Sequence, residues 1–426
     1  MNFYLFSLGC KVNSYELDAL RNSLEKEGHH EVFSPIEADL VIVNTCSVTS
    51  TADQKSRQHI RKMRRLSPNA VLAVMGCYSE LHAEETAEMG ADIVLGTSKR
   101  RELLADVERF KKEGKKIIDV KKDVRHEHYE EMGQMALADN ARAYLKIQDG
   151  CDNFCSYCLI PRLRGNSRSR EKDETLREAK RLVEAGYKEI VIAGIHIGGY
   201  GKDLGDGSYR LGNLLEDMLD LSPELPRLRI SSIEESEIDS TMLNLLKNYP
   251  QVVDHLHIPL QSGSSSVLKR MKRKYDTSAF LKTLSAIRTI RPNIAITTDI
   301  IVGFPEESDE EWKETLAFAK KAEFAEIHVF PFSPRNGTYA ATLPDTPAPI
   351  KEARVQELLS LSKELRETYE ERFYGQSLSI LFEEDDPKNG LAYGHSGNYL
   401  LVKTASSEAK HGQIASVVYS PLTKAD

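Results

Sequence analysis

Short apolar segments alternate with amphipathic helical segments along most of this chain, and this alternation limits the folds that it can adopt. Near the N-terminus, NFYLFSLG, ADLVIVNTC, NAVLAVMGC and ADIVLGT are predicted strands, and helical segments such as SYELDALRNSLEKEG lie between them. Apolar strands separated by helices are typical of parallel sheets covered on both faces. With right-handed crossovers they predict a doubly wound α/β domain over residues 1–112.

A charged stretch poor in apolar residues, 113–142, is predicted to be a linker, and the alternation then resumes. Helices are predicted at 174–185 and 277–289, among others. Strands are predicted at 144–148, 189–193, 227–231, 255–258, 295–302 and 326–332. Six βα units, two short of the common closed barrel, predict a partial (βα)6 barrel over residues 143–350 with an open side.

The C-terminal part has a different pattern. The spacing of apolar residues predicts a helix over residues 351–372. Short strand-like runs separated by Gly, Asn and Asp follow from residue 373. These runs predict a small antiparallel β-barrel over residues 373–426. No segment is apolar enough to span a bilayer, and the N-terminus lacks the pattern of a signal peptide, so we expect a cytoplasmic protein without membrane association.

Three of the six cysteines follow predicted strands of the first domain. Cys10 follows the first strand, Cys46 the second and Cys77 the third. The carboxyl ends of parallel strands share one edge of a sheet, where open α/β sheets bind ligands, so we expect these thiols to converge. Buried structural cysteines are the alternative for any one of them. Three in equivalent positions, in a reducing compartment, favour a ligand or catalytic role.

The other three cysteines, Cys151, Cys155 and Cys158, lie within eight residues in GCDNFCSYCLIPRLRG, directly after the first predicted barrel strand. Barrel enzymes keep their active sites at this end of the strands. Three thiolates can hold three irons of a cubane cluster and leave the fourth iron open. A zinc site fits this motif less well, because zinc prefers four Cys or His ligands. Disulfides also fit less well, because they would leave one of the three thiols unpaired.

Cys-x3-Cys-x2-Cys after the first strand of a partial barrel resembles the radical S-adenosylmethionine (SAM) superfamily. The resemblance implies a [4Fe–4S] cluster whose open iron chelates SAM and whose electron cleaves it to a 5′-deoxyadenosyl radical. Segments at the ends of later strands fit a SAM site: AGIHIGGYG, RISSIE, HIPLQSGS and TDIIVGFPEES. Taken singly, their glycines are more often turn residues and their polar residues more often solvated. The predicted SAM contacts are Tyr157, Gly194, His196, Gly198, Ser232, Glu234, Gln261, Ser262, Asp299, Val302, Gly303 and Phe332.

Nearly the whole chain resembles the methylthiotransferases of this superfamily, which add a C-terminal RNA-binding barrel called TRAM. SLGCKVNSYE, VIVNTCSVT, VMGCYSE and LHIPLQSGSSSVLKRMKRKY are similar to the MtaB type, which modifies N6-threonylcarbamoyladenosine (t6A) in tRNA. The resemblance implies a second [4Fe–4S] cluster on Cys10, Cys46 and Cys77 as sulfur carrier. It also implies methylthio transfer to C2 of the base at position 37. Glu306 departs from the family pattern, which has glycine there, and the tail is short for a TRAM barrel.

The expected partners are a tRNA anticodon stem-loop and an electron donor of the flavodoxin or ferredoxin type, and we expect a monomer. The net charge of −8 excludes binding to RNA through an overall basic composition, although local basic runs remain. A solvated helix face is the simpler explanation for each run. The predicted RNA contacts are Lys55, Arg57, Arg61, Arg162, Arg164 and Arg168.

Two alternatives to the t6A function remain open. One is a methylthiotransferase for another target, either isopentenyladenosine at position 37 or an aspartate of a ribosomal protein. The other is an iron–sulfur protein that binds RNA or carries electrons without radical chemistry, and such a protein would release no 5′-deoxyadenosine from SAM.

Overall fold

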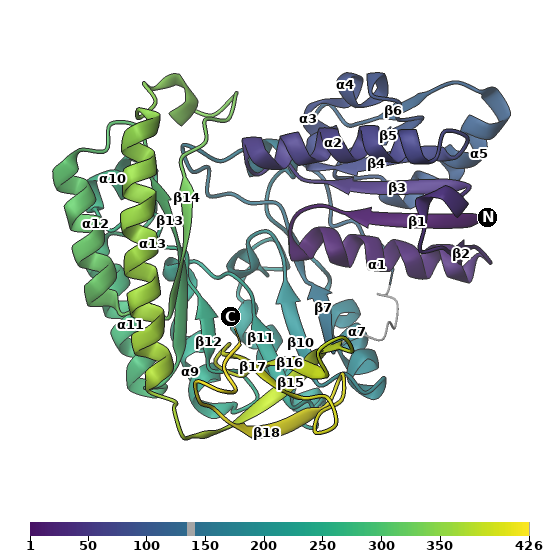
Figure 1. Cartoon of the computed structure of the whole chain (residues 1–426). Helices are drawn as coiled ribbons and strands as arrows, with labels where there is room; N and C mark the ends of the chain where they lie inside the picture. The colour runs from purple at the N-terminus through teal and green to yellow at the C-terminus, as the bar shows by residue number, and fades with distance from the viewer. Residues whose placement is uncertain (134–140, 426) are drawn as a thin grey trace. The chain divides into compact units, whose positions relative to one another are not determined.

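The computed structural model describes residues 1–133 and 141–425 (Figure 1). The part of the predicted linker at 134–140 lies outside the described residues. The chain forms two compact units. The first contains the described parts of 1–137 together with 148–153 and 158–170, and the second contains the rest. Two cysteines of the cysteine-rich loop, Cys151 and Cys158, thus belong to the N-terminal unit, and Cys155 belongs to the second unit.

A six-stranded parallel sheet forms the centre of the first unit, with the strand order β2-β1-β3-β4-β5-β6. The four predicted strands are present, and two very short edge strands join them. The strands are β1 (Asn2–Ser7), β2 (His30–Glu31), β3 (Leu40–Thr45), β4 (Val71–Gly76), β5 (Ile93–Leu95) and β6 (Ile117–Asp119). Strand β6 lies in the segment predicted to be a linker, so at least this part of the segment is structured.

Helices cover both faces of this sheet, because every central strand is apolar on both sides. One core contains side chains from α1 (Lys11–Lys26) and α5 (Leu103–Glu113). The other contains side chains from α2 (Ser50–Leu66), α3 (Cys77–Leu81) and α4 (Ala83–Glu88). The predicted doubly wound domain is confirmed. The loop segment that belongs to this unit carries β8 (Gln148–Asp149), α6 (Ile160–Leu163) and β9 (Arg168–Ser169).

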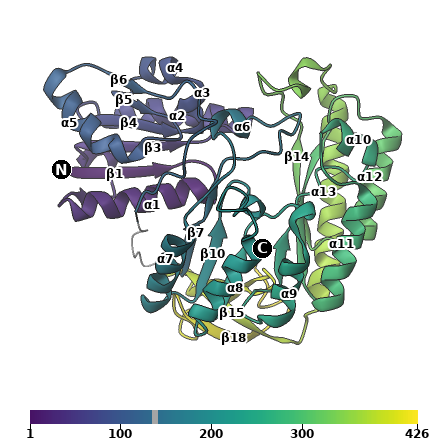
Figure 2. The ribbon, with the colours of Figure 1, turned by 180° about the vertical axis from the view of Figure 1, so that it is seen from behind.

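The second unit contains the predicted partial barrel. Its parallel strands form two three-stranded sheets, β7-β10-β11 and β12-β13-β14, and the bridges Leu228↔Val252 and Ser232↔His257 connect them. The strands are β7 (Arg142–Lys146), β10 (Glu189–Ala193), β11 (Arg227–Ile230), β12 (His255–His257), β13 (Ala295–Val302) and β14 (Glu326–Pro331). The helices are α7 (Lys172–Glu184), α8 (Leu211–Leu221), α9 (Ser240–Asn248), α10 (Ser265–Arg270), α11 (Thr277–Ile290) and α12 (Asp309–Ala322), seen from behind in Figure 2.

The C-terminal segment begins with α13 (Ala348–Glu371), which packs against β14. Its strands β15 (Ser377–Asp386), β16 (Leu391–Ser396), β17 (Leu401–Ala405) and β18 (Ile414–Val418) form one curled antiparallel sheet in the order β17-β16-β15-β18. The sheet shares its core with Ala295 and Ala325, which lie at the amino ends of β13 and β14. The tail therefore packs against the end of the barrel opposite to the predicted active site. Among the described residues, no helix is long and apolar enough to cross a membrane.

Candidate iron–sulfur and SAM sites

Cys10, Cys46 and Cys77 come together at one edge of the N-terminal sheet. Cys10 precedes the first residue of α1, Cys46 follows β3 directly, and Cys77 is the first residue of α3 after β4. Strands β1, β3 and β4 are neighbours, so their carboxyl ends lie side by side. Gly9 packs closely against the second thiol: a Cβ at Gly9 would lie 3.0 Å from the Sγ of Cys46. The geometry thus brings the three residues together as the sequence predicted.

The three thiols differ in exposure. Cys10 is exposed, whereas Cys46 and Cys77 are buried. Burial raises the pKa of both buried thiols, that of Cys77 to about 11, while the Arg164 guanidinium acts in the opposite direction. Without a metal these two thiols stay protonated at neutral pH, and binding of iron would displace their protons. Clustered thiols with a buried cation beside them fit an iron–sulfur cluster, because the cation offsets the charge of the thiolates.

Arg164 is completely buried at the centre of an ionic network. Its Nη1 lies 2.9 Å from Oε1 of Glu16 and 3.1 Å from Oδ1 of Asp149, and its Nη2 donates to Oδ1 of Asn13 at 3.0 Å. Arg100 also pairs with Glu16, at 3.1 Å. Burial by itself would lower the pKa of Arg164, but Coulombic attraction by Glu16 and Asp149 and by nearby thiols outweighs it and raises the pKa, so the guanidinium stays charged. The network fixes the cysteine-rich loop to α1, the helix that begins just after Cys10.

Hydrogen bonds to sulfur surround the second cysteine trio. The backbone N–H of Asn153 donates to Sγ of Cys151 at 3.5 Å, and that of Ile160 donates to Sγ of Cys158 at 3.4 Å. In the second unit, Nη1 of Arg273 donates to Sγ of Cys155 at 3.3 Å. Donors of this kind stabilise thiolates and adjust the potential of a cluster that they ligate. Cys151 and Cys158 belong to the first unit and Cys155 to the second. In each unit, the donors beside sulfur suit a thiolate ligand.

Within the first unit, the loop of the second trio packs directly on the first trio. Cys77 forms a small buried cluster with Leu159 and Leu163. Leu159 directly follows Cys158 in the chain, so this part of the second cysteine loop lies next to Cys77. The hydroxyl of Thr97 also donates to the backbone oxygen of Leu163 at 2.6 Å.

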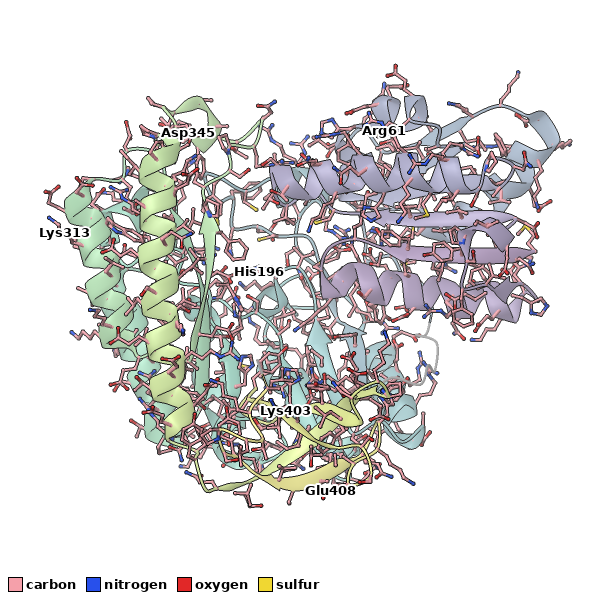
Figure 3. The ribbon with its side chains drawn as sticks, in the orientation of Figure 1. Arg61, His196, Lys313, Asp345, Lys403 and Glu408 are labelled. Atoms are coloured by element: carbon pink, nitrogen blue, oxygen red, sulfur yellow. The ribbon has the colours of Figure 1, made fainter. Side chains whose placement is uncertain are left out.

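Several predicted SAM residues hydrogen-bond to neighbouring protein groups after the barrel strands. His196, which follows β10 (Figure 3), has its Nε2 2.8 Å from Oε1 of Glu237. A Cβ at Gly198 would lie 1.9 Å from Oε2 of the same Glu237, so this carboxylate explains the glycine without reference to a ligand. Glu234 pairs with the buried Arg273, and burial raises the pKa of this carboxyl group. Arg273 therefore links the predicted SAM residue Glu234 to the Cys155 thiol.

The remaining predicted SAM contacts divide by exposure. Four of them are at least partly exposed: Gly194, Ser232, Gln261 and Asp299. The side chain of Val302 is buried, so this residue could contact SAM only through its backbone. Ser262 is buried and its hydroxyl bonds to Thr315 at 3.3 Å. Aromatic rings form one wall: Tyr157 and Phe332 each meet Phe304 edge-on. Contact between these residues and SAM stays a prediction.

The loop after β13 explains why glycine would suit position 306. Glu306 has φ 64°, in the left-handed region that favours glycine. Glu307 is buried, accepts the N–H of Gly303 at 3.0 Å and pairs with Arg354 at 2.8 Å. Burial raises the pKa of Glu307 to about 7 despite this cation. Glu307 thus anchors the predicted SAM loop to α13.

The prediction of RNA contact is wrong for Arg164 and Arg168. Both are buried and pair with Asp149, because the loop folds into the N-terminal unit. The sequence shows their charge but not the carboxylates that neutralise it. Lys55, Arg61 and Arg162 are exposed, with Arg61 on the outer side of α2 (Figure 3). Arg57 is partly exposed and lies over the ring of Tyr78. These four remain predicted contacts.

Comparison with family models and known proteins identifies the class of enzyme. Residues 145–319 match the radical SAM superfamily, and residues 2–96 match an uncharacterized protein family, UPF0004. The threonylcarbamoyladenosine tRNA methylthiotransferase MtaB of Bacillus subtilis is 41% identical over 96% of this chain and 92% of its own length. The chain belongs to the radical SAM methylthiotransferases. The two family models imply two [4Fe–4S] clusters and SAM as cofactors, and the two cysteine trios remain their predicted ligands.

Other methylthiotransferases are similar over the same length. MtaB of Thermotoga maritima is 36% identical over 88% of this chain and 85% of its own. The tRNA-2-methylthio-N6-dimethylallyladenosine synthase of Bacillus pumilus is 32% identical over 97% and 83%. Among solved structures, the radical SAM methyltransferase TsrM of Kitasatospora setae aligns with a TM-score of 0.60 over 80% of this chain and 77% of its own, at 15% identity. That likeness shows the fold alone.

Proposed function

We propose that this methylthiotransferase adds a methylthio group to C2 of t6A at position 37 of tRNA. The proposal is carried by the higher identity to proteins that bear this name, 41% and 36%, than to a dimethylallyladenosine synthase at 32%. Such a substrate places the enzyme in the cytosol, with an anticodon stem-loop and an electron donor of the flavodoxin or ferredoxin type as partners.

When bound, SAM and the two clusters supply the methyl group, the sulfur atom and the one-electron chemistry needed to replace C2–H by C2–SCH3. Cys151, Cys155 and Cys158 would hold the SAM-binding cluster, and Cys10, Cys46 and Cys77 the auxiliary one. Arg164 would balance charge at the auxiliary site. Arg273 would hold Cys155 and orient Glu234 toward SAM. The aromatic wall of Tyr157, Phe304 and Phe332 would exclude water.

A target base in the anticodon loop is unpaired and can enter the barrel without duplex opening. The exposed Lys55, Arg61 and Arg162 would bind phosphates, so binding should weaken as salt rises. Nucleoside analysis of tRNA from a deletion strain tests the substrate. Loss of 2-methylthio-t6A, with its restoration by the cloned chain, is the expected result. Loss of the isopentenyladenosine product would favour the other tRNA substrate, and unchanged nucleosides would reject a tRNA target.

A further inference from the structure

Three side chains on adjacent barrel strands form a polar cluster, of which only Asp299 is also a predicted SAM contact. His257 is on β12, Asp299 on β13 and His328 on β14, and their ligand-type atoms all lie within 4.8 Å of one another. Asp299 and His328 are direct partners across the β13–β14 ladder, and His257 is the partner of Thr297 on the other side. Direct partners in parallel strands point to the same face, so the cluster occupies one face of these strands.

This face is the accessible one. The alternate residues on the opposite face, such as Leu256, Ile300 and Ile327, are almost completely buried. The side chains of His257 and Asp299 are 17% and 26% exposed. Hence the cluster faces the interior of the partial barrel, where barrel enzymes bind their substrates, and it keeps contact with solvent.

Internal contacts fix two members of the cluster and leave one free. Nδ1 of His257 is 3.0 Å from the hydroxyl of Thr297, and Nε2 is 3.2 Å from Oδ2 of Asp299. His257 is therefore saturated and holds the carboxylate in place. His328 is exposed and makes a ring contact with His257 but no hydrogen bond to any described residue. The ligand-binding groups that remain are an imidazole of His328 and the second oxygen of Asp299.

A donor beside an acceptor is the arrangement that recognises an amide or a urea. The N6 substituent of t6A contains a urea, a hydroxyl and a carboxylate, whereas an isopentenyl group has no polar atom. We propose that Asp299 and His328 bind the N6 substituent of the substrate: Asp299 accepts from a urea N–H or the hydroxyl, and His328 donates to the urea carbonyl or the carboxylate. The inference rests on the proposed function, and it assigns Asp299 to the RNA substrate instead of SAM.

Such a site would also reject the wrong nucleoside. An isopentenyl group entering it would remove water from His328 and from the carboxylate oxygen of Asp299 that His257 does not contact. It would offer neither group a new hydrogen bond, and buried polar groups without partners are strongly unfavourable. The two residues would thus be positioned to distinguish t6A from isopentenyladenosine.

The test measures binding of anticodon stem-loop RNAs by fluorescence anisotropy with the anaerobically reconstituted holoenzyme. The RNAs carry t6A, isopentenyladenosine or adenosine at position 37. Replacements are H328L and D299L, with H328Q as the variant that keeps an N–H donor and H30L, an exposed histidine on β2, as the matched control. The readout is the ratio of dissociation constants for t6A and isopentenyladenosine in each variant, so that a general folding defect cancels.

We expect a roughly tenfold or larger loss of preference for t6A in H328L and D299L, partial preference in H328Q and no change in H30L. Unchanged ratios in H328L and D299L would overturn the inference. A metal ion bound by the wild-type holoenzyme in addition to its two iron–sulfur clusters, and lost in both H328L and D299L, would also overturn the inference. The three side chains His257, Asp299 and His328 would then form a cation site. Product analysis tests the proposed function separately from this binding site. If the wild-type enzyme forms no 2-methylthio-t6A on tRNA that carries t6A, the proposed function itself is wrong.

Discussion

Gly9 offers the sharpest single-residue test of the auxiliary site. Its φ of +113° lies outside the range of L-residues, and an alanine Cβ would come within 2.8 Å of Cβ and 3.0 Å of Sγ of Cys46. Real Cβ atoms essentially never approach so closely, so Cys46 or the β1–α1 turn must move. Backbone strain of about 1–2 kcal/mol and overpacking of about 1–3 kcal/mol give a total of about 2–5 kcal/mol. A free-energy change of about 1.4 kcal/mol corresponds to a tenfold change in a binding constant, so the affinity of the protein for the auxiliary cluster should fall about 30-fold or more.

Iron analysis after anaerobic reconstitution measures this effect. Two cubane clusters give about eight irons per chain, and G9A should retain about four. The matched control is G28A, because Gly28 also has a positive φ, of +81°, but no atom lies within 4 Å of its Cβ position. G28A should keep about eight irons. If G9A also binds about eight and forms methylthio product normally, Cys46 does not hold a cluster in the manner described.

Three further predictions concern the ionic groups around the sites. R164L removes the buried cation that Glu16 and Asp149 share and leaves only Arg100 beside Glu16 and Arg168 beside Asp149. It should therefore lower the unfolding free energy by about 3–5 kcal/mol, and R164K should lose less. Equal thermal midpoints would contradict the network. E306G should stabilise the protein by about 1 kcal/mol in denaturant unfolding by relieving the positive φ, and a lower midpoint would refute the strain. The pKa of Glu307 is raised to about 7 in the folded protein, so the folded state holds a proton that the unfolded chain has already lost. The contribution of Glu307 to the unfolding free energy should therefore decline as pH rises from about 4.5 through 7, and E307Q should flatten this decline. A pH profile that E307Q leaves unaltered would reject the raised pKa.

The long strands and the cysteine positions could be predicted because they depend on local sequence. The predicted bounds of β10 and β13 agree with the structure, since both are apolar runs with turn residues on either side. The first cysteine trio followed from topology alone: three strand ends at one edge of a parallel sheet. By contrast, β2 and β6 have two and three residues, and their pairing depends on the rest of the sheet.

Residues whose role depends on distant partners could not be predicted. Arg164 looks like an RNA-binding cation in the sequence, yet Glu16, far away in the chain, neutralises it in the interior. Gly198 suggested a close approach to SAM, whereas the side chain of Glu237 occupies the space beside it. The proximity of Asp299 and His328 follows only from the strand register. A basic residue within an apolar, Cys-rich loop was the one sequence signal that could have indicated burial of Arg164.

The most direct measurement for the whole account uses a variant with Cys10, Cys46 and Cys77 all changed to Ala. The account predicts about four irons per chain, release of 5′-deoxyadenosine from SAM at a rate close to that of the wild type, and no methylthio nucleoside on t6A tRNA. Formation of 2-methylthio product by this variant would contradict the central claim, because sulfur would then reach the base without the auxiliary site.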